Sequence, residues 1–122
     1  SWEVEGAGGP IPVMTFDQMH GPIRSVGYRL GSVAYSSDVS DLDDAALEAV
    51  SGAQLWIIDA LRYTPHPTHA HVDLALEWIA RAEVFKAVLT NLHIDLDYST
   101  LSRSLPSNVE VAFDGWRGVF DL

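Results

Sequence analysis

Two continuous apolar runs, "QLWIIDAL" at 54–61 and "FKAVLTNL" at 85–92, constrain the fold more than any other feature of this sequence. Neither run alternates apolar with polar residues, which is typical of strands buried on both faces. The stretch "HAHVDLALEWIARAE" at 69–83 lies between them and carries its apolar residues at helical spacing. Strand-like runs come first and then alternate with helical patterns. We therefore expect an α+β fold of α/β-like character, with a mixed sheet covered by helices on one face.

Shorter patterns predict the remaining elements. Gly and Pro residues at 6–12 interrupt the start of the chain, and the first predicted strand is "VMTF" at 13–16. Further strands are predicted at 23–30, 33–35 and 109–113, and Asp114-Gly115 is predicted to form a hairpin turn into "WRGVF". A first helix is predicted at 40–52, with Ser40 as its N-cap and Gly52 at its end. A second helix is predicted from a Thr68 N-cap through residue 83, and a third at 97–105 before Pro106.

The length of 122 residues predicts a single domain, 1–122. A hydrophobic fraction of 48% with four Trp is typical of a folded protein. No apolar run approaches the roughly 18 residues that a membrane span needs. The start "SWEVEGAGGP" has neither the basic nor the apolar region of a signal peptide. We therefore expect a cytoplasmic protein with no membrane partner.

The charge balance restricts the partners. Seven basic against 17 acidic residues give a net charge of −10, which repels nucleic-acid backbones, so we expect no nucleic-acid partner. A metal-dependent enzyme that acts on a phosphate ester stays possible, because bound cations set the local field in such sites. The chain has no cysteine, so any metal would need histidine and carboxylate ligands.

Four polar residues come just after strand-like runs: His20, Asp38, His69 and His93. Ligand-binding groups of open α/β sheets collect at such strand ends. Imidazoles with a carboxylate form a competent set for zinc, manganese or iron. Histidines at strand ends are also common as structural or exposed residues. The spacing alone leaves a shared metal site and four unrelated residues as open alternatives.

The stretch "HAHVD" spells most of the H-x-H-x-D-H signature of binuclear metal hydrolases, with Leu74 in the sixth place. If Thr68 caps a helix, His69 and His71 point about 200° apart around its axis and do not converge on one ion. His69 and Asp73 would then share a helix face, where a hydrogen bond between them is expected. Helical spacing also explains Leu74 as a core residue, which disfavours a damaged signature.

Neighbouring polar residues have less specific interpretations. Asp59 could support a metal ligand from behind or accept a hydrogen bond from a loop, and we favour the loop. His66 lies in a Pro-rich stretch and is expected to be exposed to solvent. Asp95 and Asp97 follow His93 closely, and we interpret them as acidic residues at the start of the next helix.

Three long phrases resemble the C-terminal half of bacterial metallo-β-lactamase-fold hydrolases: "TFDQMHGPIRSVGYRLGSVAYSSDVSDL", "LWIIDALRYTPHPTHAHVDLALEWI", and "AVLTNLHIDLDY" with the later "VEVAFDG". The branch is similar to the phosphoribosyl cyclic phosphate phosphodiesterase. The likeness runs in order from about Gly9 to Gly115. It implies one half of an αββα sandwich, in which a binuclear metal site lies between the edges of two sheets.

The resemblance also implies roles for single residues. His20 in "QMHG" and His93 in "TNLHIDLDY" would be metal ligands, and Asp38 in "YSSD" would bridge two ions of zinc or manganese. His69 in "PHPTH" would be the catalytic histidine near the substrate phosphate. Asn91 departs from the histidine that many relatives carry at that place. In the family the H-x-H-x-D-H signature lies upstream of these motifs, so "HAHVD" takes the place of the "PTH" loop and is a different part of the site.

No H-x-H-x-D-H occurs in the 122 residues, so the resemblance implies that half of the ligands are absent. The phrases "GWRGVF" and "EVFKAV" fit the family less well, which suggests an engineered half-domain. A bare sheet face predicts a homodimer that rebuilds the sandwich. Two hypotheses follow. The first is a self-associating half-domain with part of the metal site and little or no activity alone. The second is a metal-dependent phosphodiesterase for a small phosphate ester, active as a homodimer or with a complementary N-terminal half.

Overall fold

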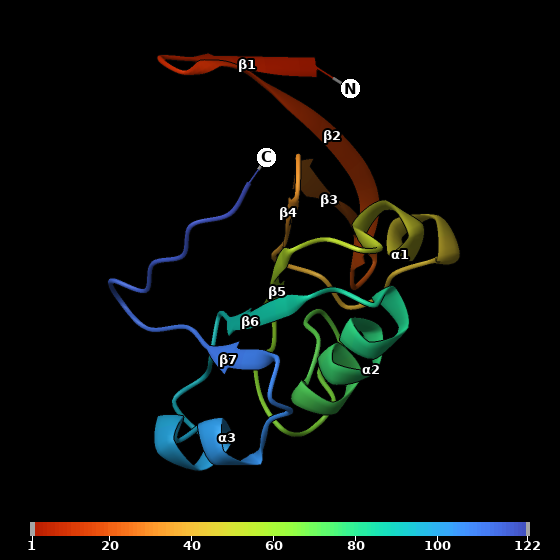
Figure 1. Cartoon of the computed structure of the whole chain (residues 1–122). Helices are drawn as coiled ribbons and strands as arrows, with labels where there is room; N and C mark the ends of the chain where they lie inside the picture. Colours follow the sequence, from red (N-terminus) through yellow and green to blue (C-terminus); the bar gives the residue numbers. More distant parts are fainter. Residues whose placement is uncertain (1, 122) are drawn as a thin grey trace.

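The computed structural model describes residues 2–121. Its strands form one seven-stranded sheet whose spatial order follows the sequence (Figure 1). Within residues 2–121, no helix is both long and apolar enough to cross a membrane. The elements are β1 (Trp2–Gly6), β2 (Gly9–His20), β3 (Ile23–Leu30), β4 (Val33–Ser36), α1 (Asp44–Val50), β5 (Leu55–Asp59), α2 (Val72–Ala82), β6 (Lys86–Thr90), α3 (Tyr98–Ser104) and β7 (Val109–Val111).

The sheet has an antiparallel part and a parallel part. Strands β1 to β4 pair antiparallel, and the β2–β3 pairing runs from Val13 opposite Leu30 to His20 opposite Ile23. Strands β4 to β7 pair parallel, and the connections between them contain α1, α2 and α3 in turn. The mixed sheet and the α+β class predicted from the sequence are confirmed.

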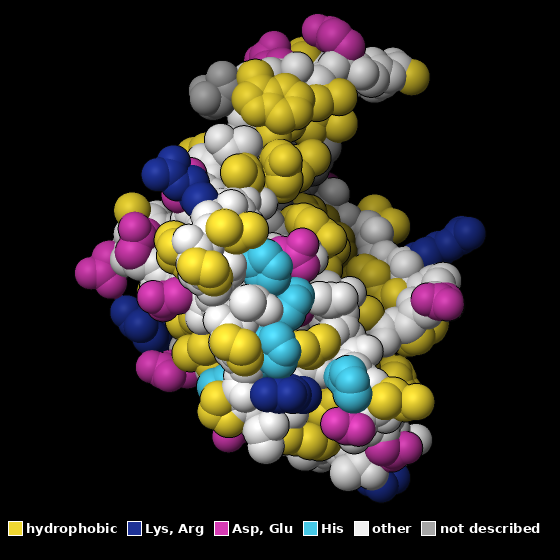
Figure 2. All heavy atoms as spheres, turned by 180° about the vertical axis from the view of Figure 1, so that it is seen from behind, with side chains coloured by type: hydrophobic (Ala, Val, Ile, Leu, Met, Phe, Trp, Pro, Cys, Tyr) yellow, Lys and Arg dark blue, Asp and Glu magenta, His cyan; other side chains and the backbone are white. Residues whose placement is uncertain are grey.

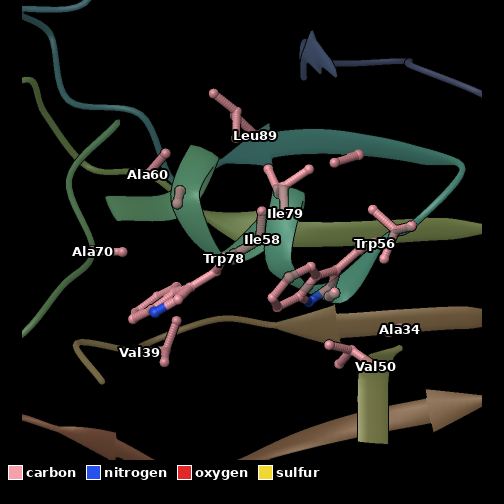
Figure 3. Packing of buried hydrophobic residues seen from close by; sticks show 14 of the residues in the cluster. Ala34, Val39, Val50, Trp56, Ile58, Ala60, Ala70, Trp78, Ile79 and Leu89 are labelled. Carbon is pink, nitrogen blue, oxygen red and sulfur yellow. The ribbon is translucent and has the colours of Figure 1, made fainter. Parts of the chain in front are cut away.

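The hydrophobic core lies between the sheet and the helices α1 and α2. Trp56 and Ile58 of β5 are fully buried and share one cluster with Val50 of α1 and with Trp78 and Ile79 of α2 (Figure 3). Burying each aliphatic side chain of this kind stabilises the fold by roughly 1.5–3 kcal/mol. Alternate residues of the continuous run in β5 therefore provide the helix-covered face.

The opposite face of the sheet leaves large apolar side chains in contact with solvent. Trp2, Val26, Tyr28 and Tyr35 are exposed to 51%, 44%, 37% and 40%, and Tyr28 lies directly opposite Tyr35 in the β3–β4 pairing. The C-terminal segment 116–120 runs along part of this face (Figure 1). It borders a groove of about 640 Å³ together with Val33, Leu55 and Ile57.

The start of the chain differs from the prediction. Strand β1 forms a hairpin with β2, and β2 begins at Gly9 instead of Val13. Pro10 and Pro12 fall in the part of β2 that pairs with β1 alone, since the pairing with β3 starts at Val13. One edge is open there, and proline without its N–H is tolerated at such an edge.

Two further details differ from the prediction. Asp43, and not Ser40, caps α1, because its Oδ1 accepts a hydrogen bond from Ala46 N–H at 2.8 Å. Asp114-Gly115 does form a turn, but the structure shows no strand between residues 116 and 121. The expected hairpin is therefore absent from the described part of the chain.

Gly27 is needed where β2 and β3 approach each other closely, directly opposite Phe16. A Cβ at this place would overlap the Phe16 ring and lie 2.7 Å from Gln18 Oε1. We predict that Gly27→Ala lowers the free energy of unfolding by about 1–3 kcal/mol, the usual cost of overpacking. Gly8→Ala is the control, because no described neighbour lies within 4 Å of a Cβ at that position. Urea denaturation followed by Trp fluorescence checks this, and equal stability of the two variants would contradict it.

Candidate metal centre

His20, the last residue of β2, is held by the loop that precedes α2. Its Nδ1 lies 2.6 Å from the carbonyl oxygen of Thr68. A carbonyl oxygen only accepts, so Nδ1 carries the proton and donates it. The neutral ring therefore keeps a free lone pair on Nε2. Metal-binding histidines use this arrangement, in which a hydrogen bond at one nitrogen fixes the tautomer and orients the other.

His69 is oriented in the same way by a buried carboxylate. It lies in the loop between β5 and α2, and its Nδ1 is 2.6 Å from Oδ2 of Asp59, whose side chain is fully buried. Asp59 also accepts hydrogen bonds from Asn91 Nδ2 at 3.0 Å and from Val39 N–H at 3.3 Å. Asp59 thus both accepts from a loop, as we favoured, and supports His69 from behind.

Asp38 presents an accessible carboxylate beside these rings. It follows β4 with a left-handed φ of +51°, a conformation that Asp adopts more readily than most residues. Its side chain is 58% exposed, and its Oδ1 lies 4.0 Å from His69 Nδ1. The backbone therefore turns at this residue and leaves the carboxylate at the surface.

The three side chains converge. His20, Asp38 and His69 each place one ligand atom within 4.8 Å of the others. Figure 2 shows histidines grouped beside a carboxylate on one face of the molecule. Two imidazoles oriented by hydrogen bonds at Nδ1 and one carboxylate suit a divalent zinc or manganese ion. The residues present therefore fit a metal. The roles expected of His20 and Asp38 as ligands and of His69 as a catalytic residue stay predictions.

His66 extends the group of imidazoles. Its ring centre is 5.4 Å from that of His69, and its Nδ1 accepts a hydrogen bond from Thr68 N–H at 3.2 Å. Desolvation lowers the pKa of His66 below the usual 6.5, and the positive charge of Arg62 lowers it further. The ring is partly buried, which corrects the expected exposure. The local Pro-rich sequence gave no signal of this, because the contacts come from the folded loop.

His93 is not a member of the group of three. Its exposed ring has Nδ1 3.3 Å from Asp95 Oδ2 and accepts a hydrogen bond from Asp95 N–H at 3.2 Å. Its role as a metal ligand stays a prediction. Asp97 caps α3 through hydrogen bonds from Thr100, which lower the pKa of Asp97, so its assignment to the helix start is confirmed.

The segment before α2 also differs from the prediction. Helix α2 begins at Val72, so Thr68 does not cap it. His69 precedes the helix and forms its hydrogen bond with Asp59, and the expected pairing with Asp73 is wrong. Tertiary hydrogen bonds from neighbouring loops override the local helical pattern here.

A model of the Beta-lactamase superfamily domain matches residues 1–94 of the chain. The chain therefore belongs to the beta-lactamase superfamily. The chain is also similar to the crystal structure of a diphosphatase of the PhnP family, with a TM-score of 0.85 and 31% identity over 94% of this chain and 44% of that one. Within the superfamily, the chain thus has the metallo-β-lactamase fold.

Two other comparisons agree in fold or in sequence. The metallo-beta-lactamase fold protein YhfI from Bacillus subtilis has a TM-score of 0.75 and 19% identity, over 94% of this chain and 51% of that one. An octanoyltransferase from Porphyromonas gingivalis (strain ATCC BAA-308 / W83) is 29% identical over 106 residues, 84% of this chain and 21% of the relative. The chain thus spans a fifth of this curated relative and about half or less of these similar structures.

Asp59 is the residue whose loss should disturb the centre most directly. In Asp59→Asn, one oxygen becomes an amide N–H₂ that faces other N–H donors. We predict a loss of about 1–3 kcal/mol in the free energy of unfolding, as for other buried polar groups left unpaired. The ring nitrogens of His69 should also shift in ¹⁵N NMR spectra. The control is Asp95→Asn, whose side chain is 71% exposed. Two variants of equal stability with unchanged His69 signals would contradict the role of Asp59.

Proposed function

We propose that this chain supplies part of the metal site of a hydrolase that acts on small phosphate esters. The observation that carries the proposal is the convergence of His20, Asp38 and His69 at one edge of the sheet. The similar structure at 31% identity is that of a diphosphatase, which supports a phosphate-ester substrate. Zinc and manganese are the proposed metals, because both accept imidazole and carboxylate ligands.

The side chains of the centre would have different roles in the reaction. His20 and Asp38 would hold the metal, and His93 would supply a further nitrogen. A bound divalent ion polarises a phosphoryl oxygen and lowers the pKa of water. In its doubly protonated form, His69 would give its Nε2 proton to the leaving oxygen and keep the Nδ1 proton that Asp59 accepts. The buried Asp59 carboxylate would stabilise the protonated ring and hold its orientation.

The assignment of ligands predicts different effects on metal affinity. His20→Ala and Asp38→Ala should weaken the binding of Mn²⁺ or Zn²⁺ at least tenfold, because each removes a direct ligand. His69→Ala should retain the affinity to within about threefold if His69 serves the proton transfer. His71→Ala is the matched control, as a partly buried histidine outside the group. Isothermal titration calorimetry of all four variants measures these effects.

The outcomes separate the alternatives. Equal affinity of the wild-type chain, His20→Ala and Asp38→Ala would refute the metal site. A loss in His69→Ala as large as in His20→Ala would make His69 a ligand instead of a proton donor.

The open face of the sheet supports a second proposal, which concerns assembly. Trp2, Val26, Tyr28 and Tyr35 are exposed on this face, and exposed apolar patches of a soluble chain commonly mark association surfaces. We propose that a second copy covers this face about a two-fold axis and completes a two-layered sheet sandwich. In this view the chain is a self-associating half-domain, with little or no turnover until the remaining ligands are supplied.

Light scattering after size exclusion tests the association. We predict a mass of twice 13.4 kDa for the wild-type chain and of 13.4 kDa for the double variant Tyr28→Lys and Tyr35→Lys. The two lysines would lie directly opposite each other on the face that the second copy covers, where their charges disfavour the association of the two copies. Ile94→Lys, at a side chain that is 91% exposed in a loop after β6, should remain dimeric. A monomeric wild-type chain would contradict the proposal.

A further inference from the structure

Gln18 is a buried polar residue that the proposed chemistry does not use. It lies in β2 two residues before His20, and only 2% of it is exposed. Its Nε2 donates two hydrogen bonds, to Ser25 Oγ at 3.2 Å and to the carbonyl oxygen of Ser37 at 3.1 Å. Its Oε1 is buried, and no atom of residues 2–121 gives it a hydrogen bond. An apolar side chain of the same size would avoid this cost, so burial alone does not explain a glutamine here.

Both partners of Gln18 lead to Asp38. Ser25 uses its hydroxyl proton to donate to the carbonyl oxygen of Asp38 at 2.8 Å, and Ser37 is the preceding residue. The carbonyl groups on both sides of the Asp38 Cα are therefore held by one connected pair of side chains. We call this pair, Gln18 and Ser25, the clamp.

The clamp acts where the backbone is strained. Asp38 has a φ of +51°, which costs energy for any residue with a Cβ. On its far side the chain is held by Val39, whose N–H donates to Asp59 and whose carbonyl accepts from Ala70 N–H at 2.6 Å. The backbone is thus fixed before and after Asp38. Its carboxylate extends from a rigid point and stays free for a ligand.

We propose that Gln18 and Ser25 are positioning residues that hold Asp38 in its left-handed conformation and so place its carboxylate beside His20 and His69. This inference rests on the proposed function, in which Asp38 binds the metal. Within residues 2–121, the hydrogen bonds of the clamp join its two side chains to each other and to the backbone carbonyl groups of Ser37 and Asp38, so it acts through Asp38 and not as a ligand.

Two variants remove the clamp with little change in volume. Gln18→Met deletes both donors, and Ser25→Ala deletes the hydroxyl group. Ser36→Ala is the matched control. Ser36 lies at the end of the same strand, and its hydroxyl oxygen accepts a buried hydrogen bond from Trp56 Nε1 at 3.0 Å. The variant deletes this hydrogen bond, which does not involve Asp38. Ser25→Thr keeps the hydroxyl and should rescue the loss.

Two measurements read out each variant of the full chain. In the metal-free chain, the three-bond coupling between the amide and Hα protons of Asp38 reports its φ. We expect this coupling to change in Gln18→Met and Ser25→Ala and to stay unchanged in Ser36→Ala and Ser25→Thr. Titration with Mn²⁺ or Zn²⁺ alone should show about tenfold weaker affinity or more in the first two variants only.

The results distinguish this inference from the proposed function. Unchanged coupling of Asp38 in both clamp variants would overturn the inference, and so would metal affinities equal to that of Ser36→Ala. If the wild-type chain binds no metal, or binds it as well as Asp38→Ala, the proposed function fails. The inference that the clamp positions a metal ligand would then be overturned as well. The coupling would still show whether the clamp determines the φ of Asp38.

Discussion

The candidate centre depends on one buried carboxylate. Asp59 is withdrawn from solvent completely, and burial of a charged group is costly unless hydrogen bonds compensate it. Here the compensation comes from three separate loops, through His69, Asn91 and the backbone of Val39. The same side chain therefore orients a ring of the site, ties down the chain after β6 and anchors the segment that carries Asp38. Charge-assisted hydrogen bonds of this kind are shorter and stronger than neutral ones.

The direction of the strands explains why these groups meet. Strands β4, β5 and β6 are parallel, so Asp38, Asp59 and Asn91 follow or end them at the same edge of the sheet. Strand β2 is antiparallel to β3, and β3 to β4, so β2 runs in the direction of β4 and ends at that edge with His20. His20 and Asn91, which are 71 positions apart in the sequence, thus lie at the same end of the sheet because of the directions of their strands.

The position of these groups at strand ends explains which features could be predicted from the sequence. The apolar runs define β5 and β6, and the residues after strand-like runs include His20, Asp38 and His69, because strand ends follow from local patterns. The N-cap of α2 was wrong because Ala70 N–H bonds to Val39, a tertiary contact that no local pattern contains. His93 follows Asn91, whose positive φ the sequence does not reveal, and its N–H bonds to the carbonyl oxygen of Leu61. The family resemblance, in contrast, depends on long phrases and tolerates such local errors.

Several locally unfavourable features lie together at this one edge, although Glu83 at the end of α2 also has a left-handed backbone. Away from it, apolar side chains fill the core and Asp43 and Asp97 cap their helices in the ordinary way. At the edge, Asp38 adopts a left-handed backbone, Gln18 buries an oxygen that receives no hydrogen bond from the described residues, and Asp59 buries a carboxylate. Folding stability alone would favour simpler residues at each of these places. Local conflicts of this kind persist where function requires a fixed geometry, and their grouping around the convergent His20, Asp38 and His69 supports the proposal that this edge is the functional site.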